Sequence, residues 1–327
     1  RWGLPAEAVD ELPDRLQQIW QRYRSCFRNR TRDPSEYAYH YLSGLLRMKG
    51  SRNFVEIGHT TGQAGENIQH FMSNSPWLAQ AVYKQVQDEI AATSALQTGG
   101  ALILDESADA KAGPCSAGAA RQRNGRLGKV DLCKVGVFLT FVIGLIWTWV
   151  DGELFLPESW FAPEQEALRQ KAGVPEECTF RTKIELGWLM ILRALRYGLP
   201  FEFVACDDLY GRAKWFRAKL DQAHIIYIAD VPRNTQVYLT RPIWGVPSKS
   251  KRKGPSPKRP RVLSPEKAVP VWQVAEDAQT HWRTLCVRPI ERGQLIAPYA
   301  AKRIWTLRDG HPTEEWLVMR READGDV

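Results

Sequence analysis

Two aspartates that each follow a short apolar run have side chains that could hold a metal ion. Asp105 follows Ala101-Leu-Ile-Leu, and Asp207 follows Phe201-Glu-Phe-Val-Ala-Cys. Apolar runs of this length, bounded by polar and turn residues, are typical of strands covered on both faces. Ligands and metals collect at the carboxyl ends of strands in open α/β sheets, so the two carboxylates predict one shared acidic site. The alternative is that each aspartate only ends its strand or caps the element that follows.

The elements around these aspartates predict a sheet that brings them together. Segments rich in Val, Phe, Ile and Trp at 130–142 and 145–156 predict a hairpin, and the capping box Thr182-Lys-Ile-Glu185 opens a helix. A basic helix at 212–223 and a strand at 225–232 follow Asp207. The order strand, strand, strand, helix, strand, helix, strand is that of a ribonuclease-H-like core. We therefore predict an α/β core with a mixed sheet, helices on both faces, and its first and fourth strands side by side, within a chain that is α+β as a whole.

Changes in composition predict three domains. Residues 1–98 carry apolar residues at helical spacing with arginine on the opposite faces, which predicts a helical domain that either holds DNA or simply exposes a solvated basic surface. Residues 99–234 contain the core. Residues 235–327, with strand-like runs at 269–275, 284–290 and 315–320, form a β-rich unit. Its loop at 248–262 is rich in proline and cations, including Lys251, Arg252 and Lys253. We expect this loop to be disordered unless it binds something acidic; phosphate-backbone binding and plain solvation are the two alternatives.

Cations surround the predicted acidic site in the sequence. A polar, glycine-rich stretch after Asp105 holds Arg121, Arg123 and Lys129, and Arg233 follows the last core strand. Guanidinium and ammonium groups bind phosphate oxygens, so these four side chains are candidate phosphate ligands. For each of them, an ordinary surface position is the alternative.

Composition limits the classes of partner. The formal charge of +8 favours an anionic partner, either nucleic acid or an acidic membrane surface. The six cysteines form no C-x-x-C pair, a pattern that suits reduced thiols in the cytoplasm. The most apolar segment, 135–150, is shorter than the roughly 20 residues that a spanning helix needs, so we expect no membrane partner.

Asn53–Gly62 has the hydrophobic-acid-hydrophobic-glycine opening of methyl-donor-binding folds, but helical sequence on both sides argues against a cofactor there.

A series of motifs between about residues 40 and 235 resembles, in family order, the DDE transposases of bacterial insertion sequences. The likeness is to the group that can be called insertion sequence family seven-oh-one. The motifs are Asn67-Ile-Gln-His-Phe-Met-Ser-Asn-Ser-Pro-Trp77, Leu104-Asp-Glu-Ser107, Ala119-Ala-Arg-Gln122, Gly125-Arg-Leu-Gly-Lys129, Leu154-Phe-Leu-Pro157, Ala172-Gly-Val-Pro175, Phe180-Arg-Thr-Lys183, Asp207-Asp-Leu-Tyr-Gly211 and Val231-Pro-Arg-Asn234.

This resemblance implies a site and a reaction. It places the first two catalytic, metal-binding aspartates at Asp105 and Asp207, with Glu106, Asp109 and Asp208 as neighbours of supporting role. It also implies a helical N-terminal region that helps bind transposon ends, and a β-rich insertion. The implied reaction is hydrolysis of a phosphodiester by two Mg²⁺ (or Mn²⁺) ions, followed by attack of the freed 3′-hydroxyl on target DNA. The implied partners are DNA and a second copy in a homodimer, in the bacterial cytoplasm at the nucleoid.

The sequence departs from the family pattern at the third acid. In the family this is a glutamate on a helix after the β-rich insertion, whereas Glu314 and Glu315 directly precede a strand-like run. Two explanations are open: an incomplete sequence, or a remnant truncated before its third carboxylate, which we would expect to be inactive. The alternative function is a DNA-binding remnant that occupies transposon ends and represses transposition without cutting.

Overall fold

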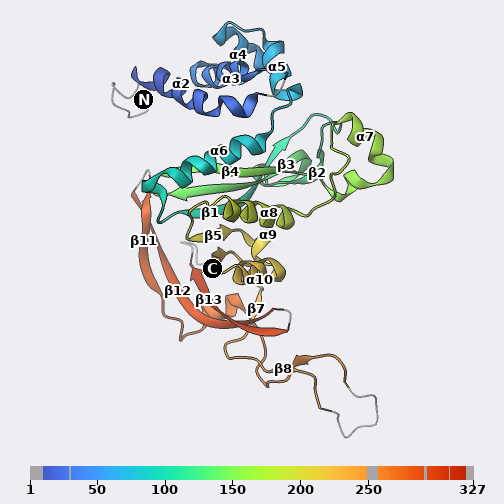
Figure 1. Ribbon diagram of the computed structural model, residues 1–327. Helices are drawn as coiled ribbons and strands as arrows, with labels where there is room; N and C mark the ends of the chain where they lie inside the picture. Colours follow the sequence, from blue (N-terminus) through green and yellow to red (C-terminus); the bar gives the residue numbers. More distant parts are fainter. Residues whose placement is uncertain (1–9, 29–30, 249–256, 291–292, 309, 322–327) are drawn as a thin grey trace. The chain divides into compact units, whose positions relative to one another are not determined.

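The computed structural model describes residues 10–28, 31–248, 257–290, 293–308 and 310–321 (Figure 1). The chain divides into two compact units. Unit 1 contains Arg1–Gly100, Phe138–Glu153 and Met190–Phe201, and unit 2 contains Ala101–Val137, Leu154–Leu189 and Glu202–Val327. The predicted phosphate ligands Lys251, Arg252 and Lys253 lie outside the described residues.

Helices make up the first part of unit 1, as predicted. They are α2 (Leu12–Tyr23), α3 (Ser35–Arg47), α4 (Phe54–Thr61), α5 (Gly65–Asn74) and α6 (Ala79–Ala92). Aromatic side chains form much of their core: the ring of Phe71 lies 5.8 Å from that of Phe27 and is stacked 5.7 Å from that of Trp77.

The segment Asn53–Gly62 forms helix α4 rather than the strand and turn of a methyl-donor-binding loop. The Asn53 side chain accepts a hydrogen bond of 2.9 Å from the Glu56 N–H, which begins the helix, and Gly62 ends it with a left-handed φ of 71°. Glycine is needed there because other residues adopt this conformation at a cost. The apolar residues of the segment therefore follow a helical period, and the strand required by a methyl-donor-binding loop is absent at this position.

A mixed sheet forms the core, with the strand order expected of a ribonuclease-H-like fold. Strands β2, β3, β1, β5 and β6 follow one another across it, and β4 pairs with β3. Strands β1 and β5 are parallel neighbours, with Leu104 opposite Cys206, so the predicted adjacency of the first and fourth core strands is confirmed. The strands are β1 (Ala101–Ala110), β2 (Ala120–Asn124), β3 (Lys129–Ile143), β4 (Ile146–Phe155), β5 (Phe203–Cys206) and β6 (Ile226–Ala229).

Two details of this sheet differ from the sequence prediction. Strand β1 does not end at Asp105 but continues to Ala110, and part of the predicted loop after it is strand β2. Both differences come from pairing with the long strand β3, since Ala120 lies opposite Cys133 and the Lys111 N–H donates to the Leu132 carbonyl. Polar side chains are acceptable in these strands because alternate residues face solvent.

Helix α8 (Lys183–Arg196) begins at the predicted capping box. In the capping box, the Thr182 N–H and hydroxyl both donate to Glu185, and the Glu185 N–H donates back to the Thr182 hydroxyl. Gly198, with φ 68°, follows the last turn. The core helices are α7 (Glu166–Lys171), α8 (Lys183–Arg196), α9 (Asp208–Gly211) and α10 (Lys214–Gln222).

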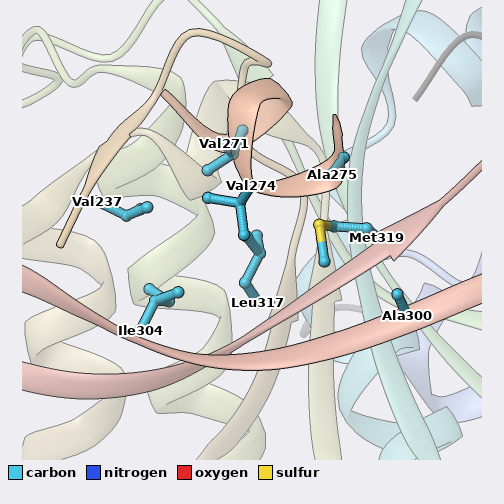
Figure 2. Packing of buried hydrophobic residues seen from close by; sticks show 8 residues of the cluster. All are labelled: Val237, Val271, Val274, Ala275, Ala300, Ile304, Leu317 and Met319. Atoms are coloured by element: carbon cyan, nitrogen blue, oxygen red, sulfur yellow. The ribbon is translucent and has the colours of Figure 1, made fainter. Parts of the chain in front are cut away.

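Residues after the core form a β-rich unit around one helix. Its elements are β7 (Gln236–Val237), β8 (Trp244–Gly245), β9 (Arg261–Val262), β10 (Val269–Pro270), α11 (Val271–Glu276), β11 (Arg283–Ile290), β12 (Gly293–Arg308) and β13 (His311–Arg320). Figure 2 shows Val271, Val274 and Ala275 of α11 against Ile304, Leu317 and their neighbours on one face of β12 and β13. The segment 269–275 was expected to be strand-like and is mostly helix, because this face needs an apolar cover.

A buried polar network links β12 and β13 to the core within unit 2. Arg308 is 4% exposed; its guanidinium donates to Asp221 of α10, to Tyr227 of β6 and to Glu315 of β13. Arg217 approaches the same Glu315 carboxylate at 3.7 Å. Glu315 is thus a structural ion-pair partner.

Along the described part of the chain, no helix combines the length and apolarity needed to cross a membrane.

Candidate active site

The pairing of β1 with β5 brings the two predicted aspartates to the same place in the sheet. Leu104 lies opposite Cys206, so Asp105 and Asp207 are the next residues in register. Neighbouring strands lie about 4.8 Å apart, which places the two backbones side by side. Asp207 caps helix α9 through a 3.0 Å hydrogen bond that its carboxylate accepts from the Leu209 N–H. Asp207 therefore caps a helix, which was the alternative to a role in the site, and it also lies beside Asp105 in the β1–β5 register.

Electrostatics show that the carboxylates at this edge act on one another. Burial raises the pKa of Asp207, and the charges of Asp105 and Glu106 raise it further, against the lowering effect of the Leu209 hydrogen bond. Carboxylates that repel in this way lose that repulsion when a cation lies between them. The edge is thus suited to binding a positive ion.

Glu106 lies on the other face of β1 and is held there by a lysine. Lys183, the first residue of α8, donates to Glu106 Oε1 at 2.9 Å, while the buried Oε2 has no hydrogen-bond partner within the described residues. Tyr210 is fully buried, and its hydroxyl also has no partner there. Burial raises the Tyr210 pKa, and the nearby charge of Glu106 adds to the increase. Sequence reasoning missed Lys183 and Tyr210 as site neighbours, although Lys183 lies in the capping box and Tyr210 in the Asp207 motif.

The carboxylates beside the pair are engaged elsewhere. Asp208 accepts from Arg212 one helical turn later, and Asp109 accepts from Lys111. In the parts of the chain that the structure describes, no group of three or more His, Cys, Asp or Glu side chains is arranged to hold a metal ion. The donor set is therefore two aspartates, whose hard oxygen atoms fit Mg²⁺ or Mn²⁺ rather than a soft metal.

Gly211 fixes the loop that carries Asp207. A Cβ atom on Gly211 would lie 1.9 Å from the backbone carbonyl oxygen of Asp230, which follows β6. The Asp230 N–H in turn donates to the Cys206 carbonyl at 3.0 Å, so the ends of β5 and β6 are tied together at this point.

Replacing Gly211 with Ala should therefore separate these two strand ends. We expect a loss of about 1–3 kcal/mol in the free energy of unfolding, the usual cost of overpacking, measured by urea denaturation. Gly173→Ala is the contrasting control, because its Cβ would meet nothing within 4 Å and only its φ of 70° would be strained. Equal losses in both variants would contradict the role given to the Gly211 contact.

The predicted phosphate ligands are exposed, but they are not all beside Asp105. Arg121 lies opposite Leu132, and the Leu132 carbonyl accepts from Lys111, six residues beyond Asp105. At about 3.3 Å per residue, roughly 20 Å of strand separates Arg121 from the acidic edge. Arg123 and Lys129 lie still further along the same hairpin, whereas Arg233 follows the end of β6.

Comparison with known proteins relates the chain to one family and to one insertion-sequence protein. A model of the family described as DDE superfamily endonuclease matches residues 22–294. A protein of Microchaete diplosiphon named "Probable transposase for insertion sequence element IS701" is 27% identical over 224 residues, which cover 66% of this chain and 53% of that protein. The match thus spans about half the length of this relative.

Proposed function

Because the chain belongs to the DDE superfamily endonucleases, we propose that it is a transposase-type endonuclease that cuts DNA at the ends of an insertion sequence. The observation that carries the proposal is the β1–β5 register of the ribonuclease-H-like sheet, in which Asp105 and Asp207 directly follow the paired residues Leu104 and Cys206. The name of the Microchaete diplosiphon relative supports an insertion sequence as the substrate.

Asp105 and Asp207 are the residues that would hold a divalent cation, as Mg²⁺ or Mn²⁺. Bound there, such ions would lower the pKa of a water molecule and neutralise charge on the leaving oxygen of a phosphodiester. The chain itself supplies the fixed position of both carboxylates: Asp105 through the β1–β5 register, and Asp207 through its cap on α9. Lys183 compensates the Glu106 charge on the other face of β1, which limits the repulsion around the pair.

A third carboxylate is expected from the family pattern, and one face of the sheet is suited to the helix that would carry it. Ile103, Ile226 and Ile228 are 39%, 69% and 58% exposed. Alternation along β1 places Ile103 on the same face as Asp105. An apolar helix face covering these residues would bring its own polar edge next to Asp105 and Asp207.

The later steps and partners follow from the same proposal. The 3′-hydroxyl freed by cleavage would attack target DNA in the same site, and a homodimer would hold the two transposon ends. Helices α2 to α6 would contribute to binding those ends. Among the predicted phosphate ligands that the structure describes, Arg233 is the best placed, while Arg121, Arg123 and Lys129 would contact DNA further from the cut.

A second function is DNA binding without cleavage. Among the described residues two aspartates lie together, and two carboxylates hold Mg²⁺ weakly unless substrate phosphates complete its shell. A protein of this kind that occupied transposon ends without cutting them would repress transposition.

Cleavage of DNA separates the two functions. The full-length protein is incubated with a supercoiled plasmid that carries the DNA flanking its own gene, with Mg²⁺, with Mn²⁺ or with a chelator. Nicks that depend on the metal and map to the element ends support the endonuclease. Binding to the same DNA without any metal-dependent nick would support the repressor and overturn the endonuclease proposal.

A further inference from the structure

The three-stranded sheet β11–β12–β13 has one covered face and one open face. The covered face carries Ala300, Ile304, Leu317 and Met319, packed against α11 (Figure 2). The residues between them point the other way, because side chains alternate along a strand. Trp316 and Val318 on this open face are 59% and 62% exposed. We call it the outer face; its residues are Arg283, Tyr299, Ala301, Arg303, Trp305, Glu314, Trp316, Val318 and Arg320.

Register places arginines and aromatic rings side by side on the outer face. Arg283 of β11 lies opposite Tyr299 of β12, and Tyr299 lies opposite Arg320 of β13. Neighbouring strands are about 4.8 Å apart, so the two arginines flank the tyrosine across roughly 10 Å. This row is a direct consequence of the observed strand pairing.

A second arginine–aromatic pair lies further along the same face. Arg303 is opposite Trp316, and its guanidinium carbon lies 4.2 Å from the centre of the tryptophan ring. Stacking of this kind uses the flat face of the guanidinium and leaves its edge of N–H groups for another acceptor. Four residues separate Arg303 from Tyr299, about 13 Å along the strand.

Arginines outnumber carboxylates among the named residues of the outer face. Arg283, Arg303 and Arg320 contribute three positive charges, whereas Glu314 is the one carboxylate among the outer-face residues. Glu314 approaches Arg303 at 4.0 Å, a distance at which an exposed pair contributes little. A face of this composition complements a polyanion that also has flat apolar groups.

We propose that the outer face of β11–β13 is a DNA-binding surface, with Arg283, Arg303 and Arg320 on phosphates and with Tyr299 and Trp316 against sugars or unstacked bases. Its length of about 13 Å matches roughly four nucleotides at 3.4 Å per nucleotide of one strand. The proposal rests on the proposed function for its choice of DNA as the polyanion. It adds a contact surface remote in sequence from Asp105 and Asp207.

The salt dependence of DNA binding tests this surface. Binding of a fluorescent duplex from the element end and of a single strand of the same sequence is measured by anisotropy with a chelator present, so that cleavage plays no part. In the triple variant Arg283→Gln, Arg303→Gln, Arg320→Gln, the slope of log affinity against log salt should fall by two to three, at about 0.9 per lost phosphate contact on duplex. A triple variant at Lys171→Gln, Lys214→Gln, Lys219→Gln removes the same charge from exposed positions on other elements and should leave the slope within one.

Two single variants separate the effect of this surface from that of a general loss of charge and from that of misfolding. Glu314→Gln should strengthen binding of both probes several-fold, which a misfolded protein would not do. Trp316→Ala should weaken single-strand binding about tenfold and duplex binding much less, since stacking on aromatic rings needs unstacked bases.

Unchanged slopes in the outer-face triple variant, or no gain with Glu314→Gln, would overturn the proposal. Binding that behaves as expected without any metal-dependent cleavage would instead retain this surface and overturn the endonuclease proposal.

Discussion

Replacing Asp105 with Asn is expected to reduce metal-dependent DNA cleavage by about 10³-fold or more, with little change in DNA affinity. Removing a single group that stabilises charge in an active site costs about 10²–10³-fold in rate, and a metal ligand should cost at least as much. The substitution keeps the size of the side chain, and Asp105 is exposed, so folding should be unaffected. Asp207→Asn should have the same effect on cleavage.

The double variant shows whether the two aspartates form one site. If both hold the same ions, loss of the second carboxylate should add little to loss of the first, because residues that act as a unit are not additive. The measurement is initial nicking rate at saturating Mg²⁺ on the plasmid carrying the element ends. Asp109→Asn is the matched control, on the same strand but paired with Lys111. The site assignment would be wrong if Asp109→Asn lowered the rate as much as Asp105→Asn.

The shared edge could be predicted from sequence because it depends on local signals. An apolar run before each aspartate predicts a buried strand, and the capping box at Thr182 and Glu185 predicts where the crossover helix begins. Once the order of elements is known, few topologies remain, and the one expected puts β1 beside β5. Asp105 and Asp207 then follow in register without any knowledge of their side-chain contacts.

Other features depend on packing between distant segments and were not predictable in the same way. Strand β12 was missed although it is 16 residues long, because its inward positions include Thr306 and Arg308, which break the apolar pattern. Arg308 is buried because Glu315, Tyr227 and Asp221 surround it, and three different elements supply these partners. The link between Lys183 and Glu106 likewise joins residues 77 positions apart. Such pairs become visible only when the fold is known.

Asp151 is expected to be the most sensitive polar position for the stability of unit 1. Its side chain is fully buried on β4, where it accepts hydrogen bonds from Arg193 Nε at 2.6 Å, from Gln80 at 3.0 Å and from the Gly152 N–H at 2.8 Å. Asp151→Ala removes the acceptor for all three donors. Breaking a buried ion pair by removing one partner costs about 3–5 kcal/mol. We expect the lower end, about 3 kcal/mol, because Arg193 keeps Glu153 as a second partner.

Thermal unfolding followed by circular dichroism measures this loss, and two substitutions give its physical cause. At about 4 °C per kcal/mol, where the ranges for smaller and larger domains meet, Asp151→Ala should lower Tm by roughly 12 °C. Asp151→Asn keeps an acceptor oxygen for Gln80 and Gly152 but loses the charge, so its Tm should lie between those of the wild type and Asp151→Ala. Glu153→Gln changes the half-buried partner of the same arginine and should cost about 1 kcal/mol or less, as semi-exposed ion pairs do. Equal losses of Tm in Glu153→Gln and Asp151→Ala would show that the ion pairs of Arg193 provide the stabilisation, rather than the buried acceptor oxygens of Asp151. In that case the hydrogen bond from Gln80 of α6 to Asp151 would contribute little to the stability of unit 1.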